Sequence, residues 1–282
     1  MTQVAFITGA SRGIGRETAL AFARAGFDVA ISARTVQEGE PSAHRLCDAQ
    51  GVPLAGSLDS TAAQIRALGR EALVVPMDLL DSASVVAAGQ AVLAAFGRID
   101  VLVNNAIYQG NDLNASFMAL QPQTLERVFK GYVLAPMLLT QRVLAAMLEQ
   151  GSGVVINVTS GAGEGDPPVA AVDGGWGYAY GAGKAAVSRV SGVLAAELGG
   201  QGIRAFTLNP GVVSTDALKA TIGERGVLAL RNGIAPPQVP AQVMVWLATA
   251  EQAPRFQRRT IAAQAFALEH AIVADWRTEV IV

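Results

Sequence analysis

A tyrosine and a lysine one helical turn apart, Tyr180 and Lys184, are the side chains in this sequence best suited to chemistry. Residues four apart on a helix share one face, and a neighbouring ammonium group favours ionisation of a phenol, whose pKa is otherwise about 10. Ser160, on a different predicted element, supplies a hydroxyl that can hold a substrate oxygen against the phenol. These groups are suited to moving a proton to or from an alcohol or carbonyl oxygen. Two solvated surface neighbours can have the same spacing.

The N-terminal segment has the pattern of a phosphate-binding turn. A short apolar run, Val4 to Thr8, predicts a buried strand, and the helical periodicity of residues 14–25 follows the glycine-rich Gly9-Ala10-Ser11-Arg12-Gly13-Ile14-Gly15. Glycines permit a tight turn, and a helix N-terminus presents N–H groups and the positive end of its dipole to a pyrophosphate. We therefore predict a dinucleotide site here.

The end of the second predicted strand indicates which dinucleotide binds. An NAD site places an acidic residue about 20 residues beyond the glycine turn, but this chain has Ala33 and Arg34 there. Arg34 and Arg12 can form a charge-assisted fork around a 2′-phosphate. The sequence favours NADP(H) over NAD(H), unless Arg34 only ends the strand in solvent.

Taken together, the motifs resemble those of the short-chain dehydrogenase/reductase family. The resemblance covers about residues 3–250 and rests on motifs that occur in the family's order: Thr8 to Gly15, Asp78, Asn104-Asn105-Ala106, Ser160, Tyr180 with Lys184, and Asn209-Pro210-Gly211 with Thr215. It implies a Rossmann-type fold and hydride transfer by a Ser160–Tyr180–Lys184 centre.

The resemblance also implies a set of cofactor contacts. The Asp78 position lies by the adenine, Asn105 and Ala106 line the cofactor, and Pro210 to Thr215 surround the carboxamide. The full predicted set is Gly9, Ser11, Arg12, Gly13, Ile14, Gly15, Arg34, Asp78, Leu79, Asn105, Ala106, Tyr180, Lys184, Pro210, Gly211, Val213 and Thr215.

Three positions depart from the family pattern. Ile107 replaces a glycine near the nicotinamide side, and Tyr132 replaces an asparagine whose backbone carbonyl links through water to the lysine. A proton relay of altered geometry is therefore expected. Residues 256–261 lack the usual Thr-Gly-Gln signal, so the subunit packing is expected to differ from the family's.

The predicted architecture is one α/β domain over residues 1–282, a doubly wound parallel sheet of about seven strands with helices on both faces. Strands and helices alternate along the chain, as in such sheets, and nearly continuous Val, Ile and Leu is typical of strands covered on both faces. The predicted strands are 3–8, 28–33, 72–76, 100–104, 153–158, 203–208 and 260–264. The predicted helices are 14–25, 59–69, 82–97, 122–149, 179–199 and 240–249.

Four segments do not follow this alternation of strands and helices. Loop 37–58 either covers the adenosine end or is a passive excursion, loop 161–177 lies beside the reacting atoms, residues 216–239 resemble a lid, and the tail 255–282 is atypical. Loops at the carboxyl ends of strands carry specificity in such folds. The candidate substrate contacts are Ile107, Trp176, Tyr178 and the lid residue Leu218, with Ile222, Val227 and Leu230 also in the lid. Ordinary packing is the alternative for Trp176, Tyr178 and the lid.

Composition narrows the function classes. A length of 282 residues with 51% hydrophobic content suits one domain with a large core, and a net charge of −2 without a basic stripe disfavours nucleic-acid binding. Cys47 is the only cysteine, and the first residues enter a strand directly, so a cytoplasmic protein without a signal peptide is expected. His44 and His270 lack ligand spacing, so no metal is expected, nor is a membrane span. A homodimer or homotetramer is expected.

The sequence as a whole predicts an NADP(H)-dependent oxidoreductase that interconverts a ketone and a secondary alcohol, most simply by carbonyl reduction. Reduction of an imine or a C=C bond on the same fold is one alternative. A non-catalytic NADP(H)-binding sensor or scaffold is another, although such a protein has no need of Ser160, Tyr180 and Lys184 together.

Overall fold

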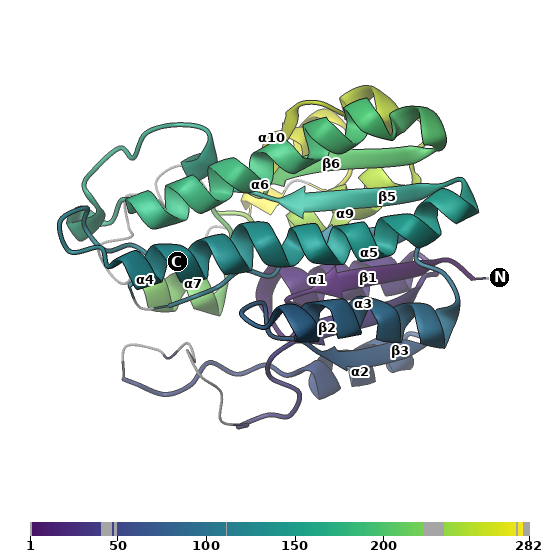
Figure 1. Cartoon of the computed structure of the whole chain (residues 1–282), viewed down its shortest axis with the longest axis horizontal. Helices are drawn as coiled ribbons and strands as arrows, with labels where there is room; N and C mark the ends of the chain where they lie inside the picture. The colour runs from purple at the N-terminus through teal and green to yellow at the C-terminus, as the bar shows by residue number, and fades with distance from the viewer. Residues whose placement is uncertain are drawn as a thin grey trace.

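A computed structural model describes residues 2–40, 47, 50–110, 112–222, 234–274 and 276–278. Its centre is a seven-stranded parallel sheet of order β3-β2-β1-β4-β5-β6-β7 (Figure 1). The strands are β1 Val4–Thr8, β2 Asp28–Ala33, β3 Ala72–Pro76, β4 Val101–Asn104, β5 Gly153–Val158, β6 Ile203–Asn209 and β7 Thr260–Ala262. The strand order reverses between β1 and β4, which confirms the predicted doubly wound, Rossmann-type fold and marks the edge where such sheets bind ligands.

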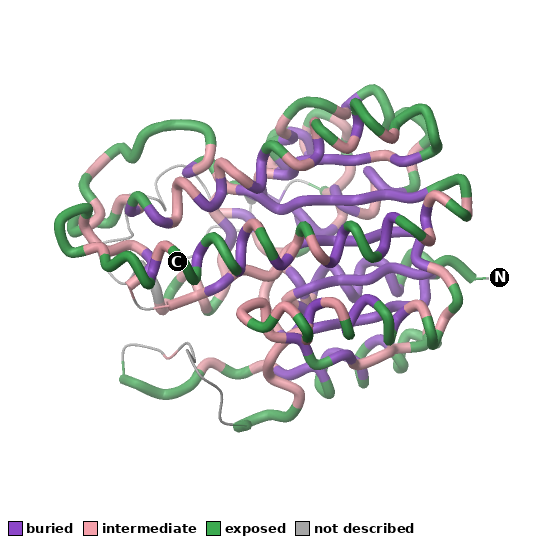
Figure 2. The backbone as a smooth tube through the Cα atoms, viewed as in Figure 1, coloured by how far each residue is buried: buried purple, intermediate pink, exposed green. Residues whose placement is uncertain are grey.

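Helices cover both faces of the sheet, and the two faces have separate cores. One face carries α1 Gly13–Arg24, α2 Leu58–Ala67, α9 Gln238–Thr249 and α10 Ala263–Glu269. The other carries α3 Ser82–Phe96, α5 Ala135–Gln150 and α6 Tyr178–Glu197. Along β1, Ala5 and Ile7 belong to the first core while Val4 and Phe6 belong to the second. This alternation explains why the strand sequence is continuously apolar, and Figure 2 shows the central strands buried, whereas the edge strands β3 and β7 are partly exposed.

The long predicted helix 122–149 is interrupted by a wider turn. It consists of α4 Pro122–Phe129, a π-helix over Lys130–Leu134 and α5. Periodicity alone does not reveal such an insertion, because the helical pattern continues on either side. Among the described residues this combined helix alone is long and apolar enough, by length and composition, to cross a membrane. Leu139, Val143 and Met147 lie in the core beneath the sheet, which accounts for much of that apolarity.

The C-terminal part of the chain contains a helix that the sequence analysis did not predict. The predicted strand 260–264 ends at Ala262, and α10 follows immediately. Phe266 of α10 packs against Trp246 and Phe256 in edge-to-face ring pairs, so tertiary packing decides the structure of this short segment. In the predicted lid, α7 Asp216–Ile222 and the beginning of α9 are described, whereas Val227 and Leu230 lie outside the described residues.

Candidate active site

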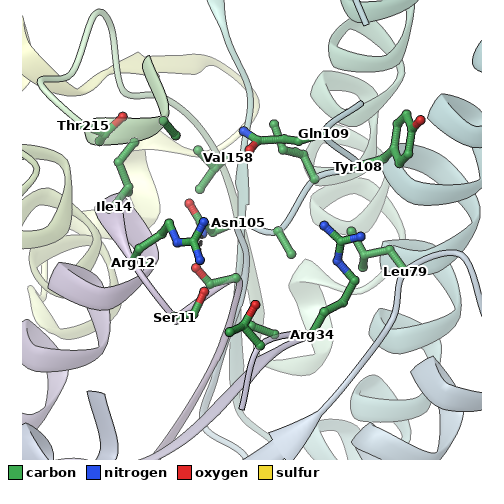
Figure 3. A pocket seen from close by; sticks show the side chains of 18 of the residues that line it. Ser11, Arg12, Ile14, Arg34, Leu79, Asn105, Tyr108, Gln109, Val158 and Thr215 are labelled. Carbon is green, nitrogen blue, oxygen red and sulfur yellow. Dashed lines mark hydrogen bonds between the residues drawn. The ribbon is translucent and has the colours of Figure 1, made fainter. Parts of the chain in front are cut away.

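A cavity of ≈ 280 Å³ opens at the carboxyl ends of the parallel strands, where the strand order reverses. The segments that follow β1 to β6 all contribute to its wall, as do α1 and α6 (Figure 3). Predicted cofactor residues in the lining are Gly9, Ser11, Arg12, Gly13, Ile14, Gly15, Arg34, Asp78, Leu79, Asn105, Ala106, Tyr180, Lys184, Pro210 and Thr215. The structure therefore brings these sequence-distant residues to one site.

The glycine turn after β1 is shaped by close backbone contacts. Gly9 has φ +72°, and a Cβ atom there would lie 2.9 Å from the Ala106 Cα. A Cβ atom on Gly15 would overlap the Gly9 carbonyl oxygen and approach the Asn105 side chain. The N-cap residue of α1, Arg12, makes no side-chain cap hydrogen bond. The turn thus forms a narrow cradle at a helix N-terminus, which suits a phosphate group.

Hydrogen bonds join this cradle to the end of β4. The Thr8 hydroxyl donates to the Val103 carbonyl at 3.1 Å and accepts from the backbone N–H groups of Asn105 and Ala106, each at 3.0 Å. In return, the Asn105 side-chain amide donates to the Thr8 carbonyl at 2.9 Å. Asn105 therefore has a structural role as well as a place in the cavity wall, and the floor of the site is fixed by buried polar contacts.

Two guanidinium groups extend into the pocket near the end of β2, from Arg12 and Arg34 (Figure 3). Ala33, Arg34 and Thr35 are the lining residues at this strand end. The residue that follows Ala33 is therefore the basic Arg34, whereas an NAD site has an acidic residue near this strand end.

Loop 37–58 is attached to one of these arginines. The Arg12 Nη2 donates to the Gly56 carbonyl at 3.2 Å, and the Gly56 N–H donates to the Glu38 carboxylate at 2.9 Å. A backbone hydrogen bond from the Leu58 N–H to the Thr35 carbonyl joins the two ends of the loop. The described part of the loop therefore contacts the glycine turn through Arg12.

Ser160, Tyr180 and Lys184 meet beside the cavity. Tyr180 and Lys184 lie in the first two turns of α6 and line the cavity, and Ser160 follows β5 and forms a side-chain hydrogen bond with Tyr180. The Lys184 Nζ donates to the Val158 carbonyl at 2.9 Å, and the Thr159 hydroxyl donates to the Lys184 carbonyl at 3.1 Å. These bonds tie the start of α6 to the end of β5.

Burial governs the protonation of these groups. Burial raises the pKa of Tyr180 above its ordinary value, and the hydrogen bond from Ser160 lowers it by less. Burial also lowers the pKa of Lys184 to about 7. The expectation that the pKa of Tyr180 falls below its ordinary value is not met in this structure, because desolvation raises it. Tyr180 is therefore a protonated phenol at neutral pH.

Only one of the four candidate substrate contacts lines the cavity. Ile107 lines the cavity, but Trp176, Tyr178 and Leu218 are absent from its lining. Tyr178 is 53% exposed, and its ring meets that of Phe117 edge to face at 5.7 Å. Trp176 lies next to Gly181 of α6, where a Cβ atom would be 3.6 Å from the Trp176 Cδ1. The side chain of Ile222 lies outside the described residues.

Two predicted cofactor residues after β6 also lie away from the cavity lining. Val213 is buried and pairs with Ala235 in an isolated bridge, while the Gly211 N–H donates to the Asn209 side chain at 3.0 Å. Gln264 of α10 holds this segment by donating to the carbonyls of Pro210 and Val212. Gly211 and Val213 therefore shape the loop that presents Pro210 and Thr215.

The sequence analysis missed several residues of the cavity wall. These residues adjoin motifs that were recognised, so extending each motif by one or two positions would have found them: Thr35, Met77, Leu80, Tyr108, Gln109, Val158, Thr159, Asp216 and Ala217. No cluster of three or more metal-ligating side chains occurs within the described ranges.

Comparison with known proteins agrees with this site. The family model described as short chain dehydrogenase matches residues 3–55 and 53–225. A short chain dehydrogenase of Pseudocercospora fijiensis is 34% identical over 217 residues, which are 76% of this chain and 60% of that protein. A cyclohexanol dehydrogenase of Rhodococcus is 31% identical over 82% of each.

A solved structure of a metagenomic short-chain oxidoreductase in complex with NADP superimposes with a TM-score of 0.68 and 29% identity. The match covers 92% of this chain and 95% of that one. The match to the family model extends from the glycine turn past Ser160, Tyr180 and Lys184. The chain therefore belongs to the short-chain dehydrogenase/reductase family, and it spans about 60% of the length of the first curated relatives that it matches.

Proposed function

We propose that the chain is an NADP(H)-dependent carbonyl reductase that converts a ketone into a secondary alcohol. The observation that carries this proposal is the convergence of Ser160, Tyr180 and Lys184 beside the cavity that begins at the glycine turn. A protein that only senses NADP(H) needs the turn but not a partly buried phenol beside a serine and a buried lysine.

The residues present fit NADP(H). The turn formed by Gly9, Gly13 and Gly15 suits a pyrophosphate, because it is too tight for Cβ atoms at Gly9 and Gly15, which would clash with Ala106, Asn105 and the Gly9 carbonyl. Arg12 and Arg34 place two guanidinium groups at the strand end where a 2′-phosphate is expected, and guanidinium groups bind phosphate through paired hydrogen bonds. When bound, the nicotinamide supplies the hydride that the protein itself lacks.

The protein's own groups supply the proton and hold the substrate oxygen. The Tyr180 hydroxyl donates its proton to the carbonyl oxygen, whose charge increases as the bond is reduced. Ser160 donates a hydrogen bond to the same oxygen. Lys184, which is fixed by the Val158 carbonyl, stabilises the phenolate that remains on Tyr180. In the alcohol-oxidising direction each proton movement is reversed.

The class of substrate follows from the wall beside the phenol. Ile107 and Tyr108 give this wall an apolar character next to Tyr180. A relative that is named for cyclohexanol supports an alicyclic ketone as the first substrate to try. Reduction of an imine or a C=C bond is the competing chemistry, and a panel of cyclic ketones, imines and enones distinguishes them.

The catalytic assignment is tested with Tyr180→Phe. We expect turnover of the best ketone to fall about 10²- to 10⁴-fold, the usual contribution of a positioned general acid, while NADPH still binds. NADPH binding is followed by its fluorescence, and consumption by its absorbance. Near-normal turnover in this variant would disprove the role of Tyr180, and a wild-type protein that binds NADPH but reduces no substrate would favour the sensor.

The cofactor preference is tested with Arg34→Ala and Arg12→Ala. Each variant should raise the KM for NADPH about tenfold or more and change the KM for NADH little, because a charge-assisted hydrogen bond contributes about 1.5–3 kcal/mol. Arg24→Ala is the control, since Arg24 is exposed in the last turn of α1. Equal losses for both cofactors would refute the proposed 2′-phosphate contact.

A further inference from the structure

Tyr132 occupies an unusual place beside the catalytic groups. It is the middle residue of the π-helix over Lys130–Leu134, a rare conformation that occurs often at functional sites. Its side chain is 1% exposed and heads the set of largest fully buried side chains. It does not line the cavity, so it acts on the site only through its neighbours.

One side chain here contacts three parts of the site. The Tyr132 hydroxyl donates to the Tyr108 carbonyl at 3.2 Å, on the cavity wall after β4. The Tyr132 ring stands edge to face against the Tyr180 ring, with centroids 6.3 Å apart and planes at 89°. The Lys184 Nζ lies over the Tyr132 ring at 5.4 Å from its centroid. The ring therefore touches both the proton donor and its lysine.

The neighbouring sequence accommodates this ring. A Cβ atom on Gly183 would lie 2.9 Å from the Tyr132 Cδ1 and 2.7 Å from the Val128 Cγ1. A Cβ atom on Gly131 would lie 2.8 Å from the Tyr108 Cβ. Both glycines thus permit approaches that no other residue allows. Gly183 lies between Tyr180 and Lys184, so the catalytic turn of α6 is itself shaped to receive the Tyr132 ring.

We propose that the aromatic ring of Tyr132 is a positioning element that holds Tyr180 and Lys184 in their working geometry, while its hydroxyl holds only the Tyr108 segment. The positively polarised edge and negative face of an aromatic ring suit these two contacts, one with another ring and one with an ammonium group. The ring also keeps water from the space between α6 and the π-helix. This inference rests on the proposed reductase function and adds a residue to it.

The kinetic test compares a variant that keeps the ring with one that loses it. Tyr132→Phe should keep kcat for the best ketone within about threefold of wild type, whereas Tyr132→Leu should lower kcat about tenfold or more with little change in the KM for NADPH. Tyr132→Met replaces the leucine variant if that protein does not fold. Phe22→Leu is the matched control, since Phe22 is a fully buried member of an edge-to-face pair with Phe27 at the C-terminal end of α1.

A second readout needs neither cofactor nor turnover. The chain has three lysines, Lys130, Lys184 and Lys219, so the ¹³C-labelled lysine side chains give few NMR signals. The Lys184 Hε signal should be displaced upfield by the Tyr132 ring, remain so in Tyr132→Phe, and return toward the position of the exposed lysines in Tyr132→Leu. This measurement tests the ring contact even if the reductase assignment fails.

Three results would overturn the proposal. Normal kcat in Tyr132→Leu would show that the ring is not needed, and an equal loss in Tyr132→Phe would assign the effect to the hydroxyl. A similar fall in kcat for Phe22→Leu would assign it to general loss of packing. A Lys184 signal that is unchanged between Tyr132→Phe and Tyr132→Leu would remove the contact itself.

Discussion

Replacing Lys184 by methionine should change how the stability of the protein depends on pH. Burial lowers the pKa of Lys184 from 10.5 to about 7, so between these values the unfolded chain binds a proton that the folded chain does not. Stability rises with pH wherever the unfolded state binds more protons. The wild-type protein should therefore gain stability relative to Lys184→Met as pH rises from 7 to 9.5.

The size of the effect follows from the same pKa. Each pH unit in this window contributes about 1.4 kcal/mol, so the difference in unfolding free energy should change by about 3 kcal/mol between pH 7 and pH 9.5. Below pH 7 the difference should be constant. The hydrogen bond to the Val158 carbonyl is lost in the variant at every pH, so it shifts the curve without changing its slope.

Urea unfolding at several pH values measures this difference. Lys219→Met is the control, because Lys219 is exposed on α7 and its replacement should leave the slope unchanged. Parallel curves for the wild-type protein and Lys184→Met would show that Lys184 is not desolvated, and would refute the electrostatic description of the site.

Three further predictions concern the cofactor end. Gly15→Ala should abolish NADPH binding, because the Cβ atom of the new alanine would overlap the Gly9 carbonyl oxygen. NADPH fluorescence measures the binding, and retained binding would show that the glycine turn is less rigid than described. Thr8→Val should lower the unfolding free energy by about 1–3 kcal/mol in urea, since it removes the acceptor of the Ala106 N–H, and an unchanged midpoint would contradict this. Glu38→Ala should raise the KM for NADPH without lowering kcat, because Glu38 holds Gly56; a fall in kcat alone would be inconsistent with that role.

Much of the fold could be predicted because the sheet is covered on both faces. Such strands are apolar at nearly every position, as in Val101–Asn104 and Gly153–Val158, each of which has one asparagine, and this pattern is visible in the sequence. The glycine turn was predictable for a related reason, since only glycine permits the contacts at Gly9 and Gly15. The order of these motifs was enough to predict the doubly wound sheet.

The details of the site depended on contacts that the sequence does not display. Tyr178 was predicted to touch substrate, but loop 161–177 is held by the Gly177 N–H, which donates to the Asn114 side chain at 3.1 Å, and Tyr178 faces solvent beside Phe117. The π-helix around Tyr132 was also invisible, because a single wider turn leaves the apolar pattern almost unchanged.

Protonation was the least predictable property. Spacing alone indicates that Lys184 lies near Tyr180, and Coulombic attraction then predicts a lowered pKa for the phenol. The sequence does not show that Lys184 is buried and Tyr180 partly buried, and desolvation of the phenol reverses the predicted direction of the pKa change for Tyr180. The sign of a pKa change therefore required the three-dimensional environment.

The central claim is that Tyr180 donates the proton in an NADPH-dependent carbonyl reduction. Single-turnover transfer of deuterium from nicotinamide-labelled NADPH to a cyclic ketone tests it most directly, with wild type and Tyr180→Phe compared at saturating cofactor. We expect deuterium on the new carbinol carbon with wild type, and transfer slowed about 10²-fold or more in the variant. Equal transfer rates, or no transfer from wild type to any ketone, would contradict it.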